Sequence, residues 1–580
     1  MLSLTTLPLL LLILLAVATF LAGASSRSLF PNPGLMASWT VRVGLVLALA
    51  VAAAILVQIQ PTGTVAVTLW RIESHLPVTL QFGVGGLGIA MVAMVAALVV
   101  SFAAADRRPL VSAALGLAAL GSVMAAMSGD LLSLFVGLQL SAAGGIGISY
   151  ARSPRAASHR IVWAAVADQA VALIWLGAVV ALYHSAGTLQ FTDVPTSSVN
   201  YVLAAILLVP ALVRLGSVAL LLAAPSTHPG ARALDVADWL VVAAVPTALV
   251  ILLRDLQLSG GVWPAASFGT VLDALGLALA LGVALWLMLE RRRSAGLGAL
   301  LLAGVALTLL GFGSDSPSGV ELGVGSALFL EFLAGFLPRA LGSPGDTAPG
   351  TRGRGWAGAL LRAGTLAAGS PLSLGFTTAV VGVGLGMQAG GAAGLMPTVG
   401  YAACLILLCL LIPYFLGLRL EGSSWRLWFL TVPGGFLVAG SIAGGWVLTG
   451  LASAIAFSGA TVPVAVTAPD PLLVQLPGIL YPQGYLALLA LLVWVAVTAL
   501  RYAAALPVVP AHIAPSAGAP EAAPRSLVPA VDLSGVQSAA RWALRAVTVG
   551  LELSERELAE RPVWLWLSTA AAIAWLMAQR

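Results

Sequence analysis

Residues 134–150 read LFVGLQLSAAGGIGISY, an almost wholly apolar stretch that contains one amide, Gln139. With the apolar residues before it, the stretch is long enough to cross the roughly 30 Å hydrocarbon core of a bilayer as a helix. The side chain of Gln forms hydrogen bonds but cannot ionise. The stretch therefore predicts a membrane helix that holds a polar group unable to carry a proton.

The composition of the whole chain is that of an integral membrane protein. Of its 580 residues, 60% are hydrophobic and only 8% are charged, and the mean hydropathy is +1.03. This apolar surface is more than one water-soluble core buries. We expect about sixteen membrane helices, because each span takes about 20 apolar residues and lipid satisfies no backbone hydrogen bond. The predicted fold class is all-α and polytopic.

The positive charges predict how the chain crosses the membrane. All 27 basic residues are Arg, the formal net charge is +5, and Arg-rich loops alternate with loops that contain almost none. By the positive-inside rule the Arg-rich loops are cytoplasmic, which predicts external termini in a multi-pass protein of the plasma (inner) membrane. The first apolar run could pass for a signal peptide, but no positive residue precedes it, and we expect a retained helix.

Three segments interrupt the predicted series of helices. Residues 60–81 alternate in polarity and are rich in Thr and Val, which predicts a small external β-hairpin. Residues 458–482 form a Pro-rich external loop. Residues 532–562 separate polar from apolar positions at helical spacing, which predicts an amphipathic helix on the membrane surface, with a solvated connector as the alternative.

These features divide the chain into five predicted parts. Two five-helix repeats follow an N-terminal part with three helices and the hairpin; then come two helices with a linker, and finally the amphipathic helix with the last membrane helix. We call the two repeats the first half and the second half. In this order the parts are residues 1–108, 109–254 (first half), 255–420 (second half), 421–524 and 525–580.

Helix breakers recur at corresponding places in the two halves. Pro210 and Gly216 lie inside the fourth predicted helix of the first half, and Gly369, Pro371 and Gly375 lie inside the fourth of the second. Interrupted helices at matching positions indicate internal repeats with a site near the midplane, and an odd number of helices per repeat inverts the second copy. Ordinary Pro-containing membrane helices are the alternative.

Ionisable groups at bilayer depth are costly and mark an ion pathway or a buried partner. Asp168 is too deep to reach the interface, and we expect it to pair with Arg214. Glu331 lies well inside its helix, where an isolated carboxyl is protonated; it could carry a proton or pair with an Arg. His159 and Arg160 are predicted at the cytoplasmic mouth of a helix. Snorkelling to the interface explains four further residues as well as function does: Arg42, Asp273, Arg339 and Arg362.

The sequence offers no pattern typical of an enzyme or a nucleic-acid binder. Cys404 and Cys409 lie in one apolar helix, where core packing is the best interpretation. The GVGGLG run at residues 83–88 lies in a predicted membrane helix with no preceding strand, so helix packing explains it better than a dinucleotide site. We therefore expect no cofactor or metal on this chain, and the lipid bilayer as one partner.

Several of these stretches resemble the antiporter-like membrane subunits of respiratory complex I (NADH:quinone oxidoreductase, subunits of L, M or N type) and the related Mrp cation/proton antiporters. LFVGLQL is similar to the family's LFVGWEGVGL, and Gln139 stands at its glutamate. AASHRIVWAAVAD is similar to AAxKAFxxxRxGD; it keeps Asp168 but has His159 at the lysine and Ala165 at the arginine. Arg214 is nearest to the family's helix-7 lysine.

The second half resembles the same family, and here too some of the family's ionisable residues are replaced. ERRR at residues 290–293 is similar to DLKR, and GFLPRAL is similar to HAFFKALL, with Arg339 near the lysine and Glu331 before the histidine. LAAGSPLSLGFTTAVV is similar to LAGxPPLSGFFSKDE, with Ala379 at the lysine. The resemblance implies proton or cation translocation coupled to quinone reduction, with quinone and NADH or another donor used by partner subunits of one membrane complex.

The substituted residues bear on whether this subunit itself translocates protons. Relatives of this kind are thought to pass protons along Glu, Lys and His, whereas Gln139 cannot ionise and Arg214 stays charged. A non-pumping structural subunit of the membrane arm is therefore one alternative. An Mrp-type antiporter or a bicarbonate-uptake membrane subunit is another.

Overall fold

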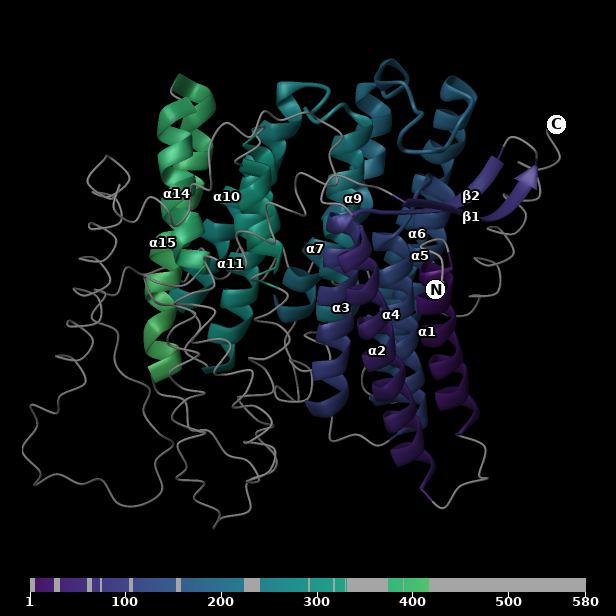
Figure 1. Ribbon diagram of the computed structural model, residues 1–580. Helices are drawn as coiled ribbons and strands as arrows, with labels where there is room; N and C mark the ends of the chain where they lie inside the picture. The colour runs from purple at the N-terminus through teal and green to yellow at the C-terminus, as the bar shows by residue number, and fades with distance from the viewer. Residues whose placement is uncertain are drawn as a thin grey trace, which may run out of the picture.

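The computed structural model is a bundle of upright helices with one β-hairpin at its side (Figure 1). Among the described residues, six helices are long and apolar enough to cross a membrane, which agrees with a multi-pass membrane protein. The structure describes residues 6–25, 32–59, 65–73, 76–103, 108–152, 158–223, 240–289, 293–314, 316, 319–328, 330, 374–389 and 391–416.

The helices begin close to the positions that the apolar runs predict. The described residues do not test the expected count of sixteen helices. The segments after residue 416, including the predicted amphipathic helix, lie outside them. The helical elements are α1 (Leu7–Ala24), α2 (Pro33–Gln58), α3 (Val84–Ala103), α4 (Pro109–Ala126), α5 (Leu131–Arg152), α6 (Ser158–Ala186), the 3₁₀ turn η1 (Thr196–Ser198), α7 (Tyr201–Ala223), the π-helical turn η2 (Leu240–Ala244), α9 (Val245–Leu258), α10 (Ala266–Leu289), α11 (Arg293–Gly313), Gly319–Leu328, α14 (Leu374–Ala389) and α15 (Gly391–Leu416).

The predicted hairpin is present between α2 and α3. Strand β1 (Val65–Glu73) pairs antiparallel with β2 (Leu76–Phe82), and two irregularities shift the register along the pair. The side of the membrane on which the hairpin lies stays a prediction from the charges of the loops.

Asp130 attaches this hairpin to the helices. Its carboxylate accepts hydrogen bonds from Thr79 N at 2.5 Å and Thr79 Oγ1 at 3.1 Å, and caps α5 through Ser133 N at 2.7 Å. Burial raises the pKa of Asp130 above its usual range, and the bonds from Thr79 and Ser133 oppose that rise. The turn between α4 and α5 is thereby fixed against β2.

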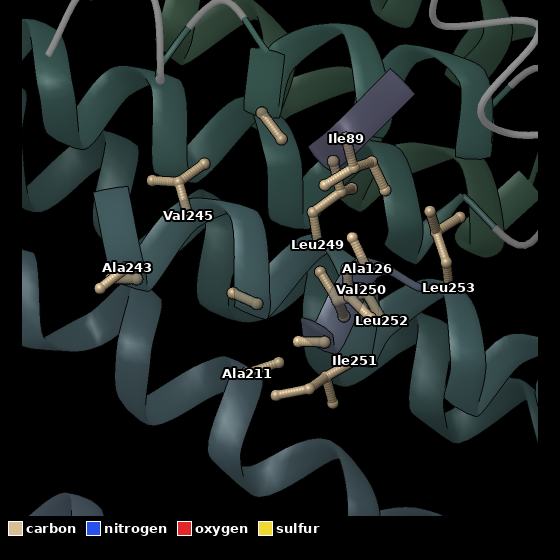
Figure 2. Packing of buried hydrophobic residues seen from close by; sticks show 14 of the residues in the cluster. Ile89, Ala126, Ala211, Ala243, Val245, Leu249, Val250, Ile251, Leu252 and Leu253 are labelled. Carbon is tan, nitrogen blue, oxygen red and sulfur yellow. The ribbon is translucent and has the colours of Figure 1, made fainter. Parts of the chain in front are cut away.

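Helix α9 is the core of the first half. Every residue of α9 except Arg254 is buried, as expected of a helix enclosed by others. Figure 2 shows its apolar side chains together with Ile89 of α3, Ala126 of α4 and Ala211 of α7, and α9 packs against all three helices. Polar side chains on α9 therefore lie in the interior of the protein.

Helices α4 and α5 pack backbone against backbone. A Cβ on Gly121 would lie 2.1 Å from Ser141 N, and one on Gly144 would lie 2.2 Å from Ala118 N. Small residues at such spacing let membrane helices approach closely, where the hydrophobic effect gives little drive for association. The small residues of the LFVGLQLSAAGGIGISY stretch therefore form the tightest helix contact of the first half that the structure describes.

Candidate ion-pair site in the first half

A buried ion pair joins α6 to α7. Arg214 Nε donates to Asp168 Oδ1 at 3.1 Å, and Arg214 Nη2 donates to Asp168 Oδ2 at 3.4 Å. The side chains are only 3% and 8% exposed. The pairing expected from the depth of the two residues is thus present in the structure.

Arg214 also binds two further helices. Its Nη1 donates to Thr247 Oγ1 of α9 at 2.5 Å, and its Nη2 donates to the carbonyl oxygen of Leu138 in α5 at 3.1 Å. The planar guanidinium presents five donors in a fixed fork, which suits it to several acceptors at once. One side chain of α7 therefore ties together α5, α6 and α9.

The irregular turn η2 supplies the next part of the site. In a regular helix the carbonyl of Val242 would accept from the N–H of residue 246, but that residue is proline and has none. Ser122 Oγ of α4 donates to this carbonyl instead, at 2.5 Å. The hydroxyl of Ser141 lies 3.3 Å from that of Ser122 and donates to Ala243 O at 3.4 Å.

Thr247 links the turn to the ion pair. Its hydroxyl accepts from Arg214 and donates to the carbonyl of Ala243. Hydrogen bonds linked in a chain polarise one another, and a buried polar group left without its bond is costly. A connected polar network thus runs from Ser122 in α4 to Asp168 in α6 inside an apolar core.

Gln139 forms a hydrogen bond outside this network. Gln169 Nε2 of α6 donates to Gln139 Oε1 at 2.8 Å. The amide nitrogen of Gln139 is buried and has no hydrogen-bond partner among the described residues. The amide therefore joins α5 to α6 and leaves a donor unused.

The chemistry of the site is that of fixed charges. The guanidinium of Arg214 stays protonated in proteins, and the carboxylate of Asp168 is held by it, so the pair is neutral as a whole. Gln139 and Gln169 cannot ionise. Among the described residues no group of three or more His, Cys, Asp or Glu side chains is placed to hold a metal ion.

The expected break in α7 is wrong for the described chain. The segment from Tyr201 to Ala223 is one α-helix that passes through Pro210 and Gly216. A proline removes one backbone donor, and packing in a membrane bundle tolerates that loss without ending the helix. Among the described residues of the first half, a π-helical turn lies in η2, at the start of the next helix.

The structure describes only some of the other predicted positions. Gly375 is buried in the first turn of α14, which begins three residues after Pro371. His159 belongs to the first turn of α6. Five residues that the sequence analysis singled out lie outside the described residues: Glu331, Arg339, Arg362, Gly369 and Pro371.

Arg42 and Asp273 differ in how far snorkelling explains them. Arg42 of α2 donates to the carbonyl of Ser101 in the last turn of α3 at 2.6 Å, where a cation is favoured by the helix dipole. Asp273 of α10 is 5% exposed and lies against Gly313 of α11. Its low exposure favours a role in the interior of the protein over interfacial snorkelling.

Three residues of the site were not predicted from the sequence. Ser122, Ser141 and Thr247 are ordinary in apolar helices, where Ser and Thr usually bond to their own backbone. Pro246 was the available signal, because a proline inside an apolar run leaves a carbonyl that a neighbouring hydroxyl can satisfy.

This fold is that of the antiporter-like membrane subunits, as the sequence resemblance predicts. A chain of the Mrp complex from Dietzia sp. DQ12-45-1b superposes with a TM-score of 0.66 at 17% sequence identity, over 99% of this chain and 62% of that chain. This chain therefore spans less than two thirds of the length of its Mrp counterpart. No protein-family model and no curated protein matches the sequence.

Two respiratory complexes contain chains of the same fold. A chain of respiratory complex I from Thermus thermophilus with bound aureothin has a TM-score of 0.54 at 19% identity, over 76% of this chain and 99% of that one. A chain of the membrane-bound sulfane sulfur reductase, an archaeal respiratory membrane complex, has a TM-score of 0.56 at 16% identity, over 77% and 97%. At these identities the likeness concerns the fold.

Proposed function

We propose that this protein is an antiporter-like membrane subunit of a complex I-like assembly and contributes to proton or cation translocation coupled to quinone reduction. The observation that supports this proposal is the fold shared with chains of three membrane complexes, across 99% of the chain in one of them. Quinone and NADH, or another donor, would be used by partner subunits, while this chain binds neither.

The full architecture belongs to the same proposal. It comprises sixteen membrane helices, two inverted five-helix repeats at residues 109–254 and 255–420, an amphipathic helix in residues 525–580, and external termini in the plasma membrane. The alternation of Arg-rich and Arg-poor loops supports the orientation in this proposal. An Mrp-type antiporter or a bicarbonate-uptake subunit would have the same architecture with different partner chains.

A second candidate function is that of a non-pumping structural subunit of the membrane arm. The contacts of Gln139 and Arg214 favour it, because neither group exchanges a proton near neutral pH and Arg214 is held by four acceptor atoms. A subunit of this kind would keep the packed network of the first half and lose its proton relay.

Ion flux in the native complex, reconstituted into vesicles, tests the proposal. Proton and Na⁺ flux driven by the electron donor would be measured for the wild-type complex and for Glu331→Gln. We expect measurable flux that falls in the variant, with Asp193→Asn, a change at an exposed residue, as the matched control. A complex with full redox activity but no flux through this subunit would favour the structural candidate, and undiminished flux in Glu331→Gln would remove that carboxyl from the path.

A further inference from the structure

Asp273 is a buried carboxyl with an unused oxygen atom. It lies in α10, is 5% exposed, and its Oδ1 has no hydrogen-bond partner among the described residues. A Cβ on Gly313 would come within 2.3 Å of this oxygen, so the carboxyl rests directly on the last turn of α11. Only a glycine at position 313 leaves space for it.

Tyr401 places a second unused oxygen close to the same point. The residue lies in α15, is fully buried, and its hydroxyl has no hydrogen-bond partner among the described residues. Its ring packs on the backbone of α14, since a Cβ on Gly382 would lie 2.4 Å from it. The side chain of Ser314 lies beside the Tyr401 hydroxyl, and Asp273 lies near enough to interact with that hydroxyl electrostatically.

Ser314, the residue that follows α11, completes the arrangement. Its hydroxyl donates to the carbonyl of Leu310 at 2.9 Å, which leaves the lone pairs of Ser314 Oγ free to accept. Asp273 of α10, Ser314 just after α11 and Tyr401 of α15 thus bring side-chain oxygen atoms close to one another at the end of α11.

The electrostatics of this region favour a positive charge. A carboxylate buried away from water is strongly disfavoured unless a partner neutralises it. Asp273 lies at the carbonyl end of α11, where the helix dipole is negative and disfavours an anion further. In the first half Arg214 supplies the neutralising charge for Asp168, whereas no such bond to Asp273 Oδ1 exists among the described residues.

We propose that Asp273, Tyr401 and Ser314 form a site for one monovalent cation, a proton or Na⁺, in the second half of the protein. The single carboxylate sets the valence, because a divalent ion would leave a net positive charge in an apolar core. The described titratable groups on the surrounding helices are Tyr401 and the buried Cys404 of α15 and the buried Glu321 of Gly319–Leu328, which has interactions of its own. As a step in translocation, this site rests on the proposed function.

Carbodiimide labelling of the assembled complex in native membrane vesicles tests the site. Dicyclohexylcarbodiimide is apolar and modifies protonated carboxyls, and mass spectrometry of the peptide with residue 273 measures the extent. We expect labelling at mildly acidic pH that is lost in Asp273→Asn. Protection by Na⁺ at constant pH identifies a Na⁺ site, and protection by alkaline pH alone identifies a proton site.

Tyr401→Phe distinguishes a site from an isolated carboxyl. Removing one hydroxyl ligand should shift the half-protecting Na⁺ or proton concentration by about tenfold, the effect of one hydrogen bond to a charged group. No labelling of Asp273 at any pH, or protection unchanged by Tyr401→Phe, would overturn the proposal. The labelling needs no turnover, so an absence of ion flux with labelling intact would count against the proposed function and leave the site standing.

Discussion

Arg214 and Asp168 stabilise the fold only as a pair. Removing charges from water is costly, and the attraction of a buried pair roughly repays that cost, whereas one charge left alone is strongly destabilising. We expect Asp168→Asn to lower the free energy of unfolding by about 3–5 kcal/mol, because Arg214 would keep its charge without a counter-ion. Denaturant titration of the purified protein in micelles measures this change.

A double-mutant cycle separates the pair from its surroundings. Asp168→Asn combined with Arg214→Gln removes both charges and should recover most of the stability that either single change loses. Asp193→Asn, at an exposed residue, serves as the control and should change stability by less than about 0.5 kcal/mol. Additive losses in the double variant would show that the two side chains act independently.

The pair was predictable because the sequence of a membrane helix indicates both the charge of a residue and its depth in the bilayer. Asp168 and Arg214 are costly at their positions, which leaves few partners to choose from. The bonds from Arg214 to the Leu138 carbonyl and to Thr247 were not predictable, since every residue has a carbonyl and the approach of α5 and α9 depends on packing.

At the scale of single elements, η2 depends on a hydroxyl from another helix. Pro246 leaves the Val242 carbonyl without its helical donor, and Ser122 supplies a bond from α4. We expect Ser122→Ala to cost about 1–3 kcal/mol of unfolding free energy, the penalty for an unsatisfied buried carbonyl. The same change made with Pro246→Ala should cost less, because residue 246 then has an N–H. Equal losses in both backgrounds, measured by denaturant titration, would contradict this account.

The kinds of element were more predictable than their irregularities. Apolar runs of membrane length predicted the helices, and alternating polarity predicted the hairpin of β1 and β2. The expected break in α7 was wrong because Pro210 removes only one donor, and a helix held on several sides stays continuous. The π-helical turn at Leu240–Ala244 has no simple periodic signature, so the sequence did not indicate it.

At the scale of the whole molecule, buried carboxyls differ in whether a described side chain neutralises them. In the first half, Arg214 neutralises Asp168 inside a network that spans five helices: α4, α5, α6, α7 and α9. The second half presents Asp273 with an oxygen that no described residue binds. A fixed charge pair has no need of a further ion, whereas a buried carboxylate without a partner needs a cation to neutralise it.

This difference predicts where ion flux in the assembled complex is sensitive to substitution. Neutralising the first half with Asp168→Asn and Arg214→Gln together removes one ion pair and leaves the net charge unchanged, so flux per complex should stay within about twofold of the wild type. Asp273→Asn removes a charge that cannot be replaced by its neighbours, and flux should fall at least about tenfold. Both variants would be reconstituted at equal occupancy and compared in one flux assay. A collapse of flux in the first variant, with assembly intact, would mean that the ion pair opens during turnover and that both halves conduct.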